Sequence, residues 1–189
     1  MAEYNQKYFK ILVVDDDRSF LNLVEKILSS EKTDYMLFPE MGELKGKYYR
    51  NNSSNRSLRS FDVATCRQGG EAVDAVKRSL KENRPFSVAF IDIRMPPGPD
   101  GVWTSEQIRV LDSDIEIVII TGYSDYHPQE IVRRVPPAHK LLYINKPLHR
   151  HEIVQFAFAL SLKWHTEVEL RKVYEKLENL EPSRRSFRF

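Results

Sequence analysis

Apolar segments without polar alternation predict the strands of this protein. Four such segments are four to six residues long, and Glu116 is the only charged position among them. Runs of this kind are typical of strands buried on both faces of a parallel sheet. Residues 61–65 are a weaker candidate for a fifth strand. The four clear segments are residues 11–14, 88–91, 115–120 and 141–144.

Between these segments the apolar residues recur at the spacing of amphipathic helices. Parallel neighbours in a sheet need crossover connections, which such helices supply. The alternation therefore predicts an α/β fold, a doubly wound five-stranded parallel sheet with helices on both faces. The helical positions are Phe20, Val24, Ile27 and Leu28, then Ala72, Val76 and Leu80, then Ile108 and Leu111.

The connection over residues 29–60 does not fit a minimal version of this plan. It is far longer than the usual connection of about four to six residues, so it is predicted to be an insertion. Several basic residues lie in it, and we interpret them as a solvated loop rather than a binding site, because charge runs usually face water. These residues are Lys45, Lys47, Arg50, Arg56 and Arg59.

The C-terminal segment predicts a helix that continues past the domain. An apolar stripe at Ile153, Phe156, Leu160 and Trp164 is followed by a second stripe with charges between its members. We expect a domain over residues 1–165 and a helical extension and tail over 166–189. The second stripe has the spacing of a short coiled coil, so a homodimer is expected, with a partner protein or an effector domain as alternatives. Its members are Leu170, Val173, Leu177 and Leu180.

Charge and cysteine content exclude several classes of function. The 29 basic and 27 acidic residues nearly cancel, so no global field favours nucleic acid or an anionic membrane. Cys66 is the only cysteine, and the start of the chain lacks the pattern of a signal peptide, which together predict a reducing, cytoplasmic location. No apolar run has the length that a membrane span needs. Any charge-based function must therefore be local.

Polar residues follow the predicted strands at their carboxyl ends. Asp15 and Asp16 follow the first strand, Asp92 the third, Thr121 ends the fourth, and Lys146 follows the fifth. The carboxyl ends of parallel strands meet at one edge of the sheet, where ligands of such folds bind. Clustered carboxylates repel each other unless a cation neutralises them, and oxygen ligands select a hard ion. The sequence therefore predicts a Mg²⁺ site at this edge.

A hydroxyl and an ammonium group complete this set and suit phosphoryl oxygens. Thr121 supplies a hydrogen-bond donor and Lys146 a compact positive charge. With a metal ion, a carboxylate nucleophile such as Asp92 takes a phosphoryl group with little other machinery. The set predicts phosphoryl transfer, whereas Asp17 is expected only to cap the first helix.

Four segments resemble, in order, the signature segments of response-regulator receiver domains. The resemblance extends from about Lys10 to Trp164 without the insertion, and it implies a flavodoxin-like fold of the receiver type. It also implies a phosphoryl group taken from a sensor histidine kinase or a phosphotransfer protein, and a change of conformation that controls an output. The segments are KILVVDDD (10–17), FIDIRMPPGPDG (90–101), IITG (119–122) and YINKP (143–147).

The resemblance implies a metal and acceptor centre. Asp92 corresponds to the phosphoacceptor, Asp16 to a direct ligand of Mg²⁺, and Asp15 to the acid that completes the pocket. The main-chain carbonyl of Arg94 corresponds to a third protein ligand. The loop over residues 95–101 departs from the family pattern, because it is one residue longer and contains three prolines.

The resemblance also implies a switch. Thr121 corresponds to the hydroxyl residue that follows the phosphoryl group, and Tyr143 to an aromatic residue that changes rotamer. Lys146 corresponds to the lysine that bridges to the acceptor or its phosphate. The bond between Lys146 and Pro147 is expected to be cis, which a tertiary amide tolerates.

Two other functions compete with this interpretation. Phosphohydrolases of the haloacid-dehalogenase type share the aspartate nucleophile, Mg²⁺, threonine and lysine, but they need an acid two residues after the nucleophile, where Arg94 stands. A receiver-like interaction module without phosphorylation is the second, although the acceptor, acids, hydroxyl and lysine are all present. We expect no enzyme beyond catalysis of its own phosphorylation and dephosphorylation.

Overall fold

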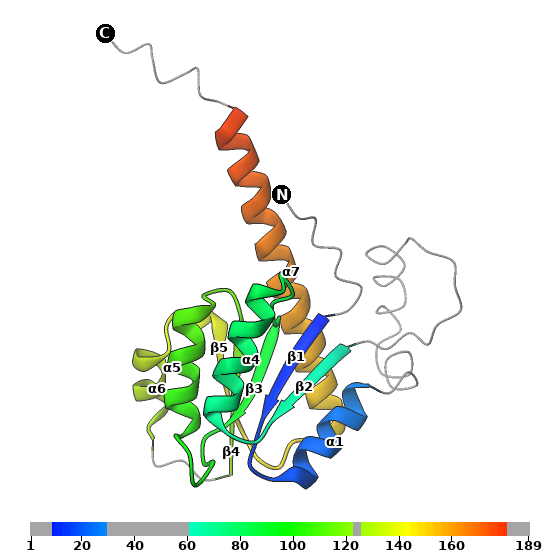
Figure 1. Ribbon diagram of the computed structural model, residues 1–189, viewed down its shortest axis with the longest axis vertical. Helices are drawn as coiled ribbons and strands as arrows, with labels where there is room; N and C mark the ends of the chain where they lie inside the picture. Colours follow the sequence, from blue (N-terminus) through cyan, green and yellow to red (C-terminus); the bar gives the residue numbers. More distant parts are fainter. Residues whose placement is uncertain (1–8, 30–60, 123–125, 181–189) are drawn as a thin grey trace, which may run out of the picture.

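The computed structural model describes residues 9–29, 61–122 and 126–180 (Figure 1). All neighbouring strands are parallel and follow the order β2-β1-β3-β4-β5, which confirms the predicted doubly wound sheet. The predicted insertion lies outside the described residues except for Ser29. The strands are β1 (Phe9–Val14), β2 (Phe61–Cys66), β3 (Val88–Asp92), β4 (Glu116–Thr121) and β5 (Leu141–Asn145).

Helices cover both faces of the sheet. α1 and α7 lie on one face, whereas α4 and α5 lie on the other with α6 beside α5 (Figure 1). None of the helices in the described ranges is long and apolar enough to cross a membrane. The helices are α1 (Arg18–Leu28), α4 (Gly69–Lys81), α5 (Gly101–Leu111), α6 (Pro128–Arg134) and α7 (Arg150–Leu180), and a short 3₁₀ turn, η1 (Ala138–Lys140), precedes β5.

Alternate residues of the central strands build two separate cores. In β1, Ile11 and Val13 pack toward α1 and α7, whereas Leu12 and Val14 pack toward α4 and α5. The strand is apolar throughout because both of its faces are covered. β5 departs from the predicted burial on both faces, since Leu142 is 38% exposed. β5 is an edge strand and has a strand neighbour on one side only.

Helix α7 continues past the amino ends of the strands, as the apolar stripe predicts (Figure 1). Its first half is buried on the sheet, and Val168 is still only 7% exposed. Beyond that point Leu170, Val173 and Leu177 are 52%, 50% and 54% exposed. These three members of the second stripe are therefore open to solvent, while the helix itself is uninterrupted.

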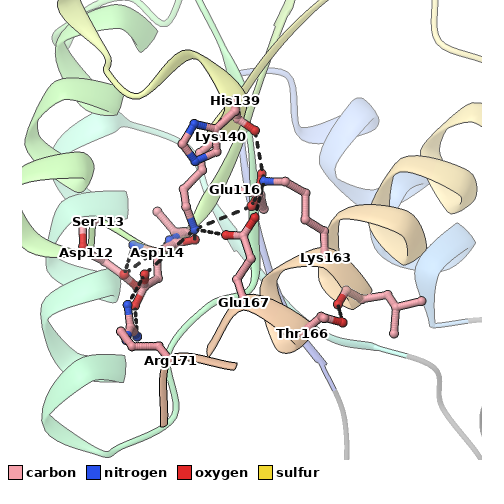
Figure 2. A network of polar contacts seen from close by, with 12 residues as sticks. Asp112, Ser113, Asp114, Glu116, His139, Lys140, Lys163, Thr166, Glu167 and Arg171 are labelled. Atoms are coloured by element: carbon pink, nitrogen blue, oxygen red, sulfur yellow. Dashed lines mark hydrogen bonds and ion pairs between the residues drawn. The ribbon is translucent and has the colours of Figure 1, made fainter. Parts of the chain in front are cut away.

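A network of ion pairs fastens α7 to the amino end of the sheet (Figure 2). Lys163 Nζ lies 2.6 Å from Oε1 of Glu116, which is buried at the start of β4. Lys140, in η1, lies 2.6 Å from Glu167 Oε2. Further along α7, a guanidinium nitrogen of Arg171 lies 2.7 Å from Asp114 Oδ1. We call these six residues the amino-end network: Asp114, Glu116, Lys140, Lys163, Glu167 and Arg171.

Candidate phosphoryl-transfer site

The turn after β1 places its three aspartates differently. Asp15 is 1% exposed, and its Oδ1 accepts a hydrogen bond of 2.9 Å from the main-chain N–H of Asp17. Asp17 is exposed and caps α1 by accepting a 2.8 Å bond from the N–H of Ser19, which confirms the predicted cap. Asp16 is partly exposed, and its carboxylate has no hydrogen bond or ion pair within the described residues.

Asp92 is held at the end of β3 by close main-chain packing. It is 6% exposed, and its Oδ2 accepts a 2.8 Å hydrogen bond from the N–H of Arg94. The N–H of Gly101 donates to the carbonyl of Ile93 over 2.8 Å and closes the loop. A Cβ at Gly101 would lie 2.0 Å from the Asp92 carbonyl oxygen, so this approach requires glycine.

Lys146 joins the two buried acids. Its Nζ lies 2.7 Å from Asp15 Oδ2 and 2.8 Å from Asp92 Oδ1. The ammonium also lies 4.7 Å from the centre of the Phe20 ring. The bond between Lys146 and Pro147 is cis, as the resemblance implies. The structure thus brings together three of the residues that the strand-end pattern singled out, Asp15, Asp92 and Lys146.

Burial and pairing act against each other at these groups. Burial raises the pKa of Asp92, although the hydrogen bond and charge of Lys146 oppose the rise. For Lys146, burial lowers the pKa, but hydrogen bonds to Asp15 and Asp92 outweigh it, and the net pKa is raised. Lys146 is therefore a firmly charged cation beside a carboxylate that burial makes costly to ionise.

Thr121 and Tyr143 lie on neighbouring strands. Thr121 is 2% exposed at the end of β4, and its carbonyl accepts a 2.7 Å bond from the N–H of Lys146. Tyr143 is half-buried and pairs with Ile119, two positions before Thr121. Strand residues two apart share a face of the sheet, so Thr121 and Tyr143 are on the same side. The roles that the resemblance gives them remain predictions.

The donor atoms at this edge fit a hard divalent cation. Carboxylate oxygens come from Asp15, Asp16 and Asp92, and the main-chain carbonyl of Arg94 follows Asp92 by two residues. Within the described ranges, however, no three or more His, Cys, Asp or Glu side chains are placed together to hold a metal ion. A cation here therefore needs carbonyl or water oxygens beside the carboxylates.

The connection between β2 and α4 contacts this edge, and the sequence analysis gave it no role. An Arg67 guanidinium nitrogen donates to the carbonyl of Asp16 over 3.2 Å. Gln68 bonds the loop after β3 through its side-chain amide. Neither residue lies in a recognised motif, and the only signal in the sequence is their place directly after a strand.

Comparison with known proteins decides the family. The family model of the response regulator receiver domain matches residues 47–158, which is more than half of the chain. The chain belongs to this family. The acidic residues after β1 lie outside the matched range of the receiver domain, and the structure joins one of them, Asp15, to Asp92 through Lys146. A search of curated proteins finds no significant match.

Solved structures share the receiver fold. A CheY-like receiver domain protein from Methanospirillum hungatei JF-1 is 20% identical with a TM-score of 0.58, covering 85% of this chain and 98% of that one. A structure named adenylate cyclase from Rhodopirellula baltica is 24% identical with a TM-score of 0.63, covering 89% and 98%. NtrX from Brucella abortus in complex with ATP is 19% identical with a TM-score of 0.60, covering 87% and 29%. At these identities, the TM-scores show a common fold.

Proposed function

We propose that this receiver domain takes a phosphoryl group onto Asp92 from a phosphohistidine of a sensor histidine kinase or phosphotransfer protein in the cytoplasm. The observation that supports this most is the position of the Asp92 carboxylate. It is buried at the carboxyl edge of the sheet and is held by the Lys146 ammonium and the N–H of Arg94. A fixed carboxylate beside a cation is suited to nucleophilic attack on phosphorus.

The transfer needs no reactant other than Asp92 and the phosphohistidine of the donor. An oxygen of Asp92 forms a bond to phosphorus while the phosphorus–nitrogen bond to the donor imidazole breaks, and the nitrogen keeps the electron pair. Lys146 neutralises negative charge beside the new acyl phosphate. The Thr121 hydroxyl would donate a hydrogen bond to it, since Thr121 directly follows Ile120, the register partner of Asp92. Water later cleaves the acyl phosphate to release inorganic phosphate. The protein thus catalyses only its own phosphorylation and dephosphorylation.

Receiver domains generally bind Mg²⁺ at their acidic pocket. In this chain Asp16, Asp92 and the main-chain carbonyl of Arg94 would hold the ion, with Asp15 completing the pocket. The ion would supply positive charge that offsets the charge of the reacting oxygens. The haloacid-dehalogenase alternative is disfavoured by the family match and by Arg94 at the position of its second acid.

Mass spectrometry after treatment with acetyl phosphate tests the acceptor. Wild type should gain one phosphoryl group in the presence of Mg²⁺, and Asp92→Asn should gain none. Asp112→Asn is a matched control, because Asp112 is also a buried aspartate whose pKa burial raises. Modification of Asp92→Asn to the wild-type extent would show that another residue is the acceptor.

We also propose that α7 carries the output, through a homodimer formed by its exposed stripe. Leu170, Val173 and Leu177 are each at least half exposed on a helix that starts four residues after Lys146 in the chain. An amphipathic extension with such a stripe is stabilised when another surface covers it. Sedimentation of wild type and of a chain ending at Trp164, each with and without beryllofluoride, tests this. A wild type that stays monomeric at high concentration in both states would exclude the homodimer.

A further inference from the structure

Gln68 directly precedes helix α4, but its side chain does not cap the helix. It is the N-cap residue of α4, and its side chain makes no capping hydrogen bond. Ser, Thr, Asp and Asn are the residues that serve best at this position, and glutamine is not among them. The Glu71 side chain instead accepts a 2.8 Å bond from the N–H of Arg67. The Gln68 side chain is therefore directed to something other than its own helix.

The partner of Gln68 is the loop between β3 and α5. Its Nε2 donates to the carbonyl of Pro96 over 3.1 Å, and its Oε1 accepts from the N–H of Gly98 over 3.0 Å. A Cβ at Gly98 would lie 2.2 Å from this Oε1, so the two residues are in close contact. One amide thus satisfies a donor and an acceptor of the same loop.

This loop has few internal hydrogen bonds to hold its shape. Pro96, Pro97 and Pro99 lack a main-chain N–H, and the main-chain bonds of the loop are a 3.2 Å bond from Gly98 to the carbonyl of Met95 and the closing 2.8 Å bond from Gly101 to the carbonyl of Ile93. Main-chain polar groups need partners, and Gln68 supplies two of them from outside the loop. Residue 94, whose main chain bonds Asp92, lies at the start of the same loop.

Arg67 contacts the other loop of the proposed site, the loop that follows β1. Its guanidinium nitrogen donates to the carbonyl of Asp16 over 3.2 Å. The two residues that follow β2 therefore hold the main chain of the loop that carries Asp16 and of the loop that follows Asp92. Because each contact is to a main-chain atom, it fixes the path of the loop and not the charge of a carboxylate.

We propose that Arg67 and Gln68 are positioning residues for phosphoryl transfer, which brace the loop after β1 and the loop after β3 around Asp92. This inference rests on the proposed function, because the step they support is the phosphorylation of Asp92. Neither side chain touches the reacting atoms. Gln68 should have a larger positioning effect than Arg67, because it makes two hydrogen bonds to a loop whose three prolines lack main-chain N–H donors.

The test combines amide exchange with phosphorylation kinetics. Gln68→Leu has a similar volume and removes both hydrogen bonds, whereas Gln68→Glu keeps the acceptor for Gly98. We expect Gln68→Leu to speed exchange of the Gly98 N–H about fivefold, the change that loss of one hydrogen bond gives, and to slow labelling of Asp92 by acetyl phosphate at saturating Mg²⁺. Gln68→Glu should show exchange nearer to wild type. Gln155→Leu, an exposed glutamine on α7, is the matched control.

A second variant disturbs the same contact from the side of the loop, so the test still decides if Gln68→Leu folds poorly. Gly98→Ala should place a methyl group against Gln68 and reproduce both effects. Wild-type labelling rates in both variants, with faster Gly98 exchange, would overturn the positioning role and leave a structural contact. Unchanged Gly98 exchange in Gln68→Leu would show that the brace does not form. A wild type that accepts no phosphoryl group would refute the proposed function instead, while exchange would still report on the contact.

Discussion

The two ends of the sheet each carry a cluster of charged side chains, and the clusters differ in balance. At the carboxyl end, Asp15 and Asp92 share the single ammonium of Lys146. The amino-end network pairs three acids with three bases (Figure 2). The first cluster therefore has a surplus of negative charge in the described structure, whereas the second is neutral.

This difference in charge balance distinguishes a functional cluster from a structural one better than the pKa shifts of the buried acids do. Burial raises the pKa of Asp92 and also that of Glu116, and in both cases a lysine opposes the rise. The same shift therefore appears at both ends. A buried, uncompensated carboxylate is costly, and a cation bound beside Asp15 and Asp92 would neutralise this surplus. The amino-end network has no surplus of negative charge for a cation to neutralise.

The largest expected effect comes from removing the buried acid of the amino-end network. Glu116→Gln leaves Lys163 and Lys140 with less compensation, so we expect the free energy of unfolding to fall by about 2–3 kcal/mol. The loss is smaller than the usual loss of about 3–5 kcal/mol, because Glu167 contacts both lysines. Urea unfolding at pH 7 measures this change.

Glu178→Gln is the matched control for that experiment. Glu178 is exposed on α7 and makes no hydrogen bond or ion pair with the described residues. Its replacement should change stability by less than about 0.5 kcal/mol. Equal stability of the two variants would mean that the network contributes nothing, and the contrast between the two ends of the sheet would fail.

At the carboxyl end, Lys146→Met should lower the free energy of unfolding, and Mg²⁺ should restore most of this loss. The change leaves Asp15 and Asp92 unpaired, and we expect a loss of about 2 kcal/mol without metal. Mg²⁺ at about tenfold over its dissociation constant should return about 1.4 kcal/mol. The gain should exceed that of wild type, because Lys146 no longer competes for the carboxylates. Thermal unfolding with and without Mg²⁺ decides this, and an equal gain in both proteins would contradict the competition.

The carboxyl-end cluster was predictable from the sequence. Parallel strands bring their ends to one edge, so the positions of Asp15, Asp92, Thr121 and Lys146 in the chain were enough to place them together. The main-chain contacts that hold them were not predictable. Gly101 was part of a recognised segment, but its close approach to Asp92 depends on how the loop folds back.

The amino-end network was not predictable for a physical reason. Glu116 stood out as the one charged position in a strand, but its partner Lys163 lies on α7, 47 residues away. Apolar spacing predicts which face of a helix is buried and leaves open how the helix lies along the sheet. Helix α6 was missed because it has seven residues and one buried side chain, Ile131, too few to show a period. The proline after His127 was the available signal.

A smaller effect is expected where α7 leaves the sheet. Arg171→Gln removes the ion pair with Asp114, and because both side chains are partly exposed the loss should be below about 1 kcal/mol. The Arg171 hydrogen bond is the main cause that lowers the pKa of Asp114. A lowered acid pKa stabilises the protein above the unfolded value of about 3.9 and loses this contribution as pH falls through the folded value.

The difference between wild type and Arg171→Gln should therefore be present at pH 7 and shrink as the pH falls below about 4. Urea unfolding at a series of pH values measures it. Lys176→Gln, on the part of α7 beyond the network, should show no such trend. A difference that is constant with pH would assign the effect to helix packing rather than to the charge on Asp114.

The smallest change in stability is expected for Asp16→Ala, which acts on function alone. Asp16 is partly exposed, and its carboxylate has no partner in the described structure, so its removal costs no ion pair. It also relieves repulsion with Asp15 and Asp92, so the free energy of unfolding without metal should stay within about 0.5 kcal/mol of wild type. Mg²⁺ affinity should nevertheless fall at least tenfold, since a direct ligand is lost. Calorimetric titration with Mg²⁺ beside urea unfolding separates the two quantities. Unchanged affinity would exclude Asp16 as a ligand, and a large loss of stability would show that this end of the sheet, like the other, is held together by its charges.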